Sequence, residues 1–321
     1  MRVFGIVALA ALLGPAGEGA QRTPWGDPDL QGAWTNQTPV PLERPDGLAH
    51  KPHFTTEEAA EFERTALTRI LALVEPEIPV SGELNAIWLE TQDGKVTHNL
   101  RTSQIVDPPD GKVPFTTEGR ARWEAVPTLE RMLAGHDLDA SVPEDRTFDE
   151  RCITAGGLFF PNPFYNNYHQ IFQAPGYVVI VSEMMHEVRI IPLDRRPHVG
   201  PGIAQWLGDS RGWWDGDTLV VETARFNGKG HIRGATQHLR MVERFARLDN
   251  DAIAYQLTLT DPQTFTRPWT IENTLRRSDN AVYEVACHEG NYGLANILSA
   301  ARHEESEATE APSEPLIQIR H

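Results

Sequence analysis

Residues 208–226 read GDSRGWWDGDTLVVETARF. Two β-rich runs, Gly208 to Trp214 and Thr218 to Phe226, flank the turn Asp215-Gly216-Asp217. An Asp-Gly pair between two such runs is a strong signal for a tight hairpin, because glycine adopts the positive φ that the turn needs. The stretch therefore predicts two antiparallel strands joined by a hairpin.

The same texture of short β-rich runs and tight turns extends on both sides of this hairpin. The runs predict about nine strands joined mostly by hairpins, at residues 169–173, 177–183, 188–192, 208–214, 218–226, 239–248, 252–260, 269–277 and 281–288. Such a series favours a mainly β fold, an up-and-down antiparallel meander that curves into a barrel over residues 152–301. A two-sheet sandwich is the alternative.

The chain before the meander, residues 21–151, is expected to be a loop-rich arm with two helices. Thr55 and Glu58 form a capping-box pattern, which predicts a helix from there to about residue 74. Phe115-Thr116-Thr117-Glu118 repeats this start and predicts a second helix toward residue 133, with a break at Pro127.

The two ends of the chain carry further signals. Arg2 and the apolar run 3–16 form a positive charge followed by an h-region, so residues 1–20 are predicted to be a signal peptide and the protein to be periplasmic or secreted. The run is too short for a membrane span. Residues 293–301 predict a short closing helix, and residues 302–321 an acidic, disordered tail.

Composition limits the partners. The net charge of −16 and the pI near 5.2 repel phosphate backbones, so nucleic acid and anionic membrane surfaces are not expected, and a small-molecule ligand is. Cys152 and Cys287 are the two cysteines. In an oxidising compartment they could form one long-range disulfide, and two buried thiols are the alternative. The sequence leaves the oligomeric state open.

The tripeptide Gly32-Ala33-Trp34 is similar to the Gly-x-Trp signature that opens the first strand of lipocalin-type barrels. This resemblance implies a lipocalin-like, calycin-type barrel around a small-molecule pocket. The lipocalin family is usually shorter and lacks so long an arm.

A second resemblance covers most of the mature chain. It rests on Tyr168-His169-Gln170-Ile171-Phe172, Arg189-Ile190-Ile191-Pro192-Leu193-Asp194, Gly208-Asp209-Ser210-Arg211-Gly212, Gly216-Asp217-Thr218-Leu219-Val220-Val221-Glu222-Thr223 and Cys287-His288-Glu289-Gly290-Asn291-Tyr292-Gly293-Leu294. These stretches resemble a large uncharacterised family of exported soil-bacterial proteins. The resemblance implies export and gives no residue a role.

Ionisable side chains on otherwise apolar strand faces are the candidates for chemistry. Strand alternation places Glu183 on one face with Val179 and Val181, and Arg189 on one face with Ile191. If these faces point into the barrel, Glu183 and Arg189 lie at one mouth with His186 in the turn between them. We predict Glu183 and His186 as a proton-transfer pair. A salt bridge that closes the hairpin is the structural alternative.

Other residues complete this predicted site. The further catalytic candidates are Glu222, His238 and His288; Arg189 and Arg211 would polarise a carbonyl or bind a carboxylate; Asn167, Tyr168 and Trp214 would line the pocket. Phe164-Tyr165-Asn166-Asn167-Tyr168 mixes amides with aromatic rings, as an entrance that binds ring compounds would. Glu222 and Glu243 both interrupt apolar strand faces, and Arg–Glu pairs that only stabilise the barrel are the alternative interpretation.

These patterns predict a periplasmic enzyme that acts on a small ring-containing molecule, phenolic, terpenoid or sugar-like, by general acid–base chemistry. Lyase, isomerase and hydrolase are all compatible. No glycine-rich phosphate loop or recognised metal-ligand spacing occurs, so no cofactor is predicted.

Two alternatives remain. One is a non-catalytic, lipocalin-like small-molecule-binding protein, in which every buried acid is matched by an arginine, whereas an enzyme would keep at least one unpaired acid or histidine. The other is a metal- or haem-dependent oxidoreductase that uses histidines of the meander half, namely His186, His198, His231, His238 or His288.

Overall fold

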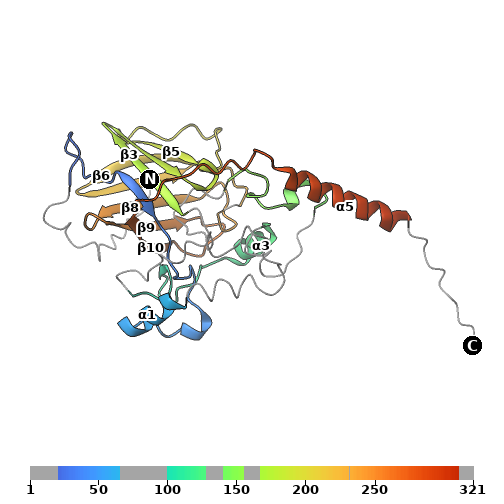
Figure 1. Ribbon diagram of the computed structural model, residues 1–321, viewed down its shortest axis with the longest axis horizontal. Coiled ribbons are helices and arrows are strands. Elements are labelled where there is room, and N and C mark those ends of the chain that lie inside the picture. The colour runs from blue at the N-terminus through green and yellow to red at the C-terminus, as the bar shows by residue number, and fades with distance from the viewer. Residues whose placement is uncertain (1–20, 66–99, 128–139, 155–166, 231, 311–321) are drawn as a thin grey trace, which may run out of the picture.

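Residues from the arm and from the meander half together build one antiparallel sheet, bent into a nearly closed barrel of nine strands (Figure 1). The computed structural model describes residues 21–65, 100–127, 140–154, 167–230 and 232–310. The strands are β1 (Gly32–Thr35), β2 (Ile105–Asp107), β3 (Tyr168–Ala174), β4 (Tyr177–Ser182), β5 (Val188–Pro192), β6 (Asp209–Asp215), β7 (Thr218–Ala224), β8 (Arg240–Arg247), β9 (Ala252–Thr260) and β10 (Trp269–Arg277). Their order is β5-β4-β3-β1-β10-β9-β8-β7-β6, and β2 pairs with one end of β10.

The predicted antiparallel meander is confirmed, with one strand exchanged. The strand expected at residues 281–288 is absent from the described structure, where this segment has no regular conformation. Its place beside β10 belongs to β1, which carries the Gly-x-Trp tripeptide and pairs with both β10 and β3. The boundary expected at residue 151 therefore does not separate arm from barrel, since the arm supplies β1 and β2.

The two end strands of the sheet, β5 and β6, face each other without a hydrogen-bonded ladder among the described residues; we call this boundary the β5–β6 seam. Gly212 on β6 allows the close approach. A Cβ atom at Gly212 would lie 2.7 Å from Leu193 Cδ2 and 2.8 Å from Ile191 Cγ2, both of which belong to the chain at β5. The seam is thus closed by side-chain packing.

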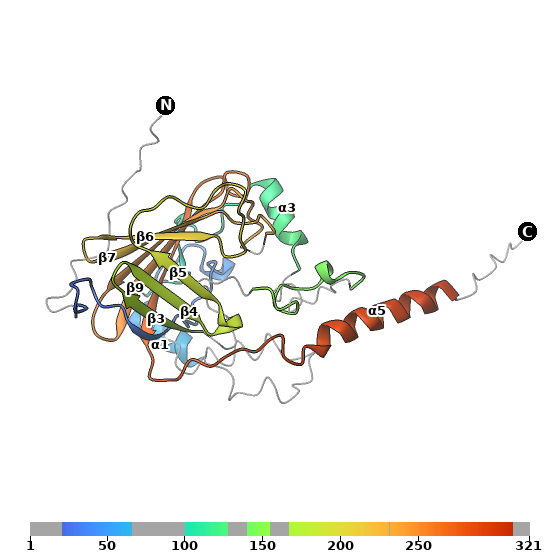
Figure 2. The same ribbon diagram turned by 90° about the horizontal axis from the view of Figure 1, so that it is seen from above.

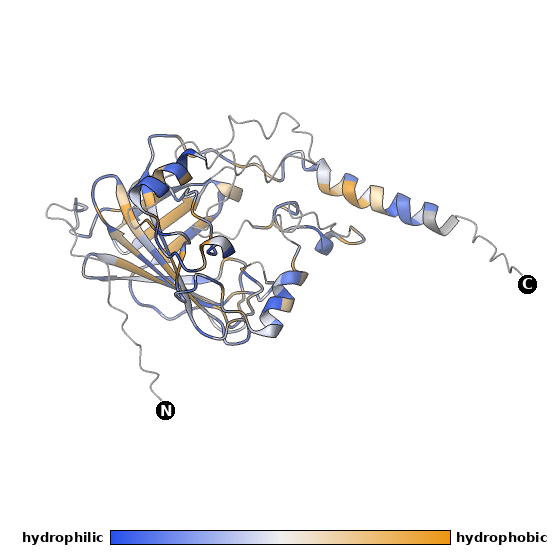
Figure 3. Ribbon diagram, turned by 90° about the horizontal axis from the view of Figure 1, so that it is seen from below, coloured by the Kyte–Doolittle hydropathy of each residue, from blue (hydrophilic) through white to orange (hydrophobic). Residues whose placement is uncertain are grey.

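Strand alternation directs large apolar side chains into the barrel, and the hydropathy colouring places apolar residues along the strands (Figure 3). Trp34, Phe245, Tyr255 and Trp269 are all 0 or 1 % exposed. Trp34 donates its indole N–H to the carbonyl of Leu30 at 2.9 Å. The guanidinium groups of Arg247 and Arg277 lie 5.0 and 5.6 Å from its ring, so this end of the core is covered by cation–π contacts.

Three helices lie outside the barrel in the described structure: α1 (Thr56–Arg64), α3 (Thr117–Ala125) and α5 (Tyr292–Glu310). Single 3-10 turns occur at Asp46–Leu48 (η1), Pro143–Asp145 (η3) and Met184–His186 (η4). Thr55 and Glu58 form the predicted capping box of α1. Thr116 caps α3 by accepting a hydrogen bond from Gly119. The expected continuations at residues 66–74 and 128–133 lie outside the described residues.

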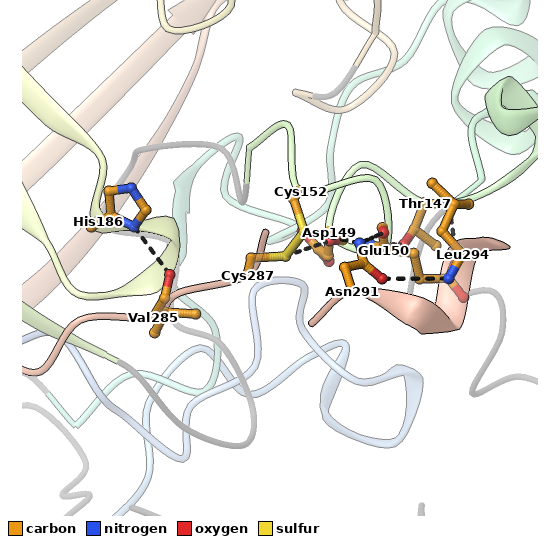
Figure 4. The surroundings of a disulfide bond; sticks show 9 residues. All are labelled: Thr147, Asp149, Glu150, Cys152, His186, Val285, Cys287, Asn291 and Leu294. Carbon is orange, nitrogen blue, oxygen red and sulfur yellow. Dashed lines mark hydrogen bonds between the residues drawn. A yellow bond between two sulfur atoms is a disulfide. The ribbon is translucent and has the colours of Figure 1, made fainter. Parts of the chain in front are cut away.

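After β10 the chain runs as a segment, residues 278–291, that we call the C-terminal strap. Cys152 and Cys287 form a disulfide that fixes the strap to residues 147–152, the end of the arm (Figure 4). Asn291 donates to the carbonyl of Glu150 and accepts from the backbone N–H of Leu294, so it also caps α5. Helix α5 then projects away from the barrel (Figure 2).

The helix expected to end near residue 301 continues to Glu310, so the disordered tail predicted from residue 302 is wrong as far as that residue. Residues 311–321, like the predicted signal peptide 1–20, lie outside the described residues. None of the helices described has both the length and the hydrophobicity that a membrane crossing requires.

Candidate functional site

The barrel interior holds a polar cluster centred on Arg189 of β5. The guanidinium crosses the β5–β6 seam to Glu243 of β8, with Nη1 donating to Oε1 at 3.0 Å and Nη2 to Oε2. Nη2 also lies 3.3 Å from the hydroxyl oxygens of Ser210 and Thr223. The side chains of Arg189 and Glu243 are 5 and 0 % exposed. One arginine thus connects β5 with β6, β7 and β8 in a buried region.

Glu243 has a second donor in the phenol of Tyr255, whose hydroxyl lies 3.1 Å from Oε1. Burial, together with the nearby Glu243 charge, raises the pKa of Tyr255, so the phenol keeps its proton. The carboxylate therefore receives a bidentate arginine and a neutral hydroxyl. This is the pairing that a buried charge needs to be tolerated in a core.

His169 forms the neighbouring part of the cluster. Strand alternation in β3 directs it inward with Ile171 and Gln173. Its Nδ1 lies 3.0 Å from the Ser182 hydroxyl, and its Nε2 lies 3.3 Å from the Asn36 side-chain oxygen. Burial and then the positive charge of Arg189 lower the pKa of His169 to about 3. The imidazole is therefore neutral at neutral pH.

A serine, a histidine and an asparagine in this order resemble the nucleophile, base and orienting residue of acyl-transfer enzymes. The low pKa of His169 argues against acyl transfer by these residues. A general base works best when its pKa is near the working pH, and that of His169 lies several units lower. Ser182 and His169 are also only 5 % exposed. The geometry suits positioning better than proton transfer.

Two donors of the cluster remain without a hydrogen-bond partner among the described residues: Arg189 Nε and Asn36 Nδ2. Both atoms are buried, and both residues neighbour His169. Because an unpaired buried donor costs about 1–3 kcal/mol, such groups call for a ligand or water that accepts hydrogen bonds.

The predicted proton-transfer pair is not assembled. Glu183 is buried beyond the end of β4, and its Oε1 accepts from the backbone N–H of Tyr283 in the strap. His186 is exposed, and its Nδ1 lies 3.0 Å from the carbonyl oxygen of Val285 (Figure 4). No hydrogen bond joins the two side chains in the described structure. Both residues hold the strap against η4.

The face expected to line the barrel in β4 is also wrong. Val178, Ile180 and Ser182 point inward, whereas Val179 and Val181 are half-buried on the outside. On β5 the prediction holds, because Arg189 and Ile191 are both buried and the Ile190 between them is exposed. Glu183 follows the end of β4 as the residue before η4, and its backbone is right-handed helical, so the alternation that assigned its face no longer applies.

Glu222 and Arg211 lie on the outer face of β6 and β7. His198 bridges two carboxylates there, with Nδ1 3.0 Å from Asp209 Oδ2 and Nε2 3.2 Å from Glu222 Oε1. Arg211 donates to Asp209 at 2.6 Å. The network attaches the β5–β6 connection to the barrel wall and does not face the interior cluster.

The remaining predicted residues are dispersed. His238 and His288 are exposed. Tyr168, at the start of β3, accepts a hydrogen bond from Asn280 at 2.9 Å. Asn167 is buried, and its carbonyl accepts from Asn36. Trp214 packs against the core, with a buried indole N–H that has no partner in the described part of the chain. Phe164, Tyr165, Asn166 and His231 lie outside the described residues.

Sequence reasoning thus identified Arg189 and noticed Glu243, but its site omitted His169, Ser182, Asn36 and Tyr255. A usable signal was present for His169, because alternation from Ile171 places it on the buried face of β3. Ser182 could be found from its alternation with Ile180 and from the β3–β4 hairpin, which places it opposite His169. Asn36 follows from no local pattern, since its role depends on which strands become neighbours. In the described residues, no group of three or more histidine, cysteine, aspartate or glutamate side chains is arranged to hold a metal ion.

Comparisons with known proteins add one fold-level likeness. No protein-family model and no curated protein matches the chain. Among solved structures, a "secretary abundant heat soluble" (SAHS) protein from Ramazzottius varieornatus matches 41% of this chain and 86% of its own, with 12% sequence identity and a TM-score of 0.24. The fold assignment therefore rests on the strand order and register described above, a mainly β, nearly closed antiparallel barrel.

Proposed function

We propose that this protein binds a small molecule inside its barrel without transforming it. The observation that carries the proposal is the Arg189–Glu243 pair, because a buried acid matched by an arginine distinguishes a binding barrel from an acid–base enzyme. The low basicity of His169 points the same way. The two unpartnered donors, Arg189 Nε and Asn36 Nδ2, supply an anchor for a ligand.

The proposed location is the periplasm or the extracellular space. A disulfide between residues 135 positions apart persists in an oxidising compartment and is uncommon in a reducing cytosol. This supports the export expected from the N-terminal sequence.

The test uses N-phenyl-1-naphthylamine, a neutral fluorophore whose emission rises in apolar surroundings. We expect saturable binding to the purified protein with one site per chain. Ser210→Leu places a bulky side chain beside Arg189 and should weaken binding at least tenfold. The control is the double variant Phe172→Ser/Ile190→Ser, which removes two exposed apolar residues from the outer face and should bind as the wild type does.

Two results contradict the proposal. Fluorescence that increases without saturation would mean that no defined site exists. Loss of binding in the outer-face variant with retention in Ser210→Leu would place the probe outside the barrel. Circular dichroism of each variant verifies that it is folded.

A further inference from the structure

The chemistry of the polar cluster restricts what the proposed site can bind. Its unpartnered groups in the described structure are N–H donors, Arg189 Nε and Asn36 Nδ2. A ligand that satisfies them must present a hydrogen-bond acceptor. A carbonyl oxygen and a carboxylate both qualify on this criterion, so the charge of the cluster has to decide between them.

The cluster has no surplus positive charge. Glu243 already forms a bidentate ion pair with Arg189, and Glu187 is a second carboxylate close enough to act on that guanidinium. His169 is neutral because burial lowers its pKa to about 3, and Tyr255 is neutral because its pKa is raised. An incoming carboxylate would therefore be a buried charge without a counterion, which costs several kcal/mol. A carbonyl oxygen would bring a dipole only.

Apolar side chains lie on the strands next to Arg189. Ile180 is the register partner of Arg189 across β4 and β5, and Ile171 is the partner of Ile180 across β3 and β4. All three residues face the interior, and the two isoleucines are each 1 % exposed. Beside the polar groups of the cluster, the ligand would therefore meet hydrocarbon side chains.

We propose that the barrel interior selects neutral, carbonyl-bearing apolar molecules over the corresponding carboxylates, with Arg189 Nε donating to the carbonyl oxygen and Asn36 Nδ2 supplying a second donor. This inference rests on the proposed function, because it names the ligand class of the same site. Ketones, aldehydes, esters and lactones on a hydrophobic frame belong to this class.

Three naphthalenes that share one ring system separate the effects of shape, acceptor and charge. They are 2-acetylnaphthalene, a neutral ketone; 2-naphthoate, its carboxylate counterpart; and 2-ethylnaphthalene, which has no acceptor. We expect the ketone to bind at least ten times more tightly than 2-naphthoate or 2-ethylnaphthalene, as measured by isothermal titration calorimetry at pH 7.5.

A conservative variant assigns the preference to the guanidinium. Arg189→Lys keeps a positive charge for Glu243 but removes the Nε donor. We expect this variant to lose most of the preference for the ketone over 2-ethylnaphthalene, because only the Asn36 donor remains, and its affinity for 2-ethylnaphthalene to be unchanged. Arg244→Lys is the matched control, because Arg244 pairs with Asp215 on the outer face and should leave all three affinities as they are.

The outcomes distinguish this inference from the proposed function. If 2-naphthoate binds as tightly as the ketone, or the ketone binds no better than 2-ethylnaphthalene, the carbonyl preference is refuted while binding stands. If N-phenyl-1-naphthylamine binds but none of the three naphthalenes does, the inference fails alone. If no probe binds, both fail.

Discussion

At the scale of single residues, His169 is a titratable group in an environment far from that of water. Its pKa is lowered from 6.5 to about 3, first by burial and then by Arg189. A histidine whose folded-state pKa lies below its unfolded-state pKa takes up a proton more readily in the unfolded chain. Its contribution to stability is therefore complete above pH 6.5 and is lost as the pH falls toward 3.

His169→Gln tests this linkage. We expect the wild type to lose up to about 4–5 kcal/mol of unfolding free energy through this group between pH 7 and pH 3, and the variant to lack that part of the pH dependence. Urea titrations at pH 7.0, 5.5 and 4.5 measure it. The exposed His288→Gln variant is the control and should follow the wild type. If the unfolding free energy falls with pH equally for His169→Gln and the wild type, His169 is not the source of this pH dependence.

The pKa of Asp149, beside the disulfide, is raised, whereas that of His169 is lowered. Burial and the neighbouring Glu150 raise its pKa from 3.8 to about 6. The folded state therefore binds the proton more tightly, and the stability that this provides below pH 3.8 is lost as the pH rises through 6. At pH 7.5, the free energy of unfolding of Asp149→Asn should exceed that of the wild type by about 1–3 kcal/mol. At pH 3.8, the two values should be nearly equal.

The control for Asp149→Asn is Asp279→Asn, which removes one negative charge from an exposed turn. It separates the local effect from the reduction of the overall net charge of −16. If both variants are stabilised equally at pH 7.5, the reduced repulsion between negative charges explains the effect, and the buried carboxyl of Asp149 does not.

At the scale of the elements, Arg189 and Glu243 join strands that share no backbone ladder. Removing one member leaves a buried charge unpaired. We expect Arg189→Met to lose about 3–5 kcal/mol of unfolding free energy and the double variant Arg189→Met/Glu243→Met to recover most of it. Chemical denaturation of the four members of this cycle gives the coupling energy.

The exposed pair of Arg244 with Asp215 provides the reference for that cycle. Arg244→Met should cost less than about 1 kcal/mol, because water already screens both charges. If the Arg189 variant costs no more than the Arg244 variant, the interior pair does not carry the stability assigned to it.

Hairpins were the part of the fold that the sequence could predict. Asp215-Gly216-Asp217 and the other turns specify pairing between neighbours in the chain, and strands β3 to β5 and β6 to β10 follow this rule. The strand beside β10 required long-range pairing with β1, which no turn encodes. The site failed partly for the same reason, since Asn36 reaches His169 only when β1 pairs with β3.

At the scale of the whole molecule, the disulfide ties the C-terminal strap to the end of the arm. Cys152 and Cys287 enclose a loop of 135 residues in sequence, so the bond restricts the unfolded chain strongly. Cys152→Ser/Cys287→Ser should lower the unfolding free energy by about 3–5 kcal/mol. Urea midpoints measure the loss.

Reductant supplies the control for this prediction. Dithiothreitol should bring the wild type to the midpoint of the double variant and leave the double variant unchanged. Coincident midpoints for the oxidised wild type and the double variant would mean that the strap is held without the covalent link.

The β5–β6 seam has a mechanical consequence for the whole barrel. Widening the barrel anywhere else breaks a ladder of backbone hydrogen bonds, whereas parting the seam breaks none in the described structure. Its resistance comes from Arg189 reaching Ser210 and from Gly212 fitting between Ile191 and Leu193. The line along which the barrel wall can part most easily therefore runs directly beside its polar cluster. If the barrel binds a ligand as proposed, the seam is where the wall can admit it without breaking a ladder of backbone hydrogen bonds.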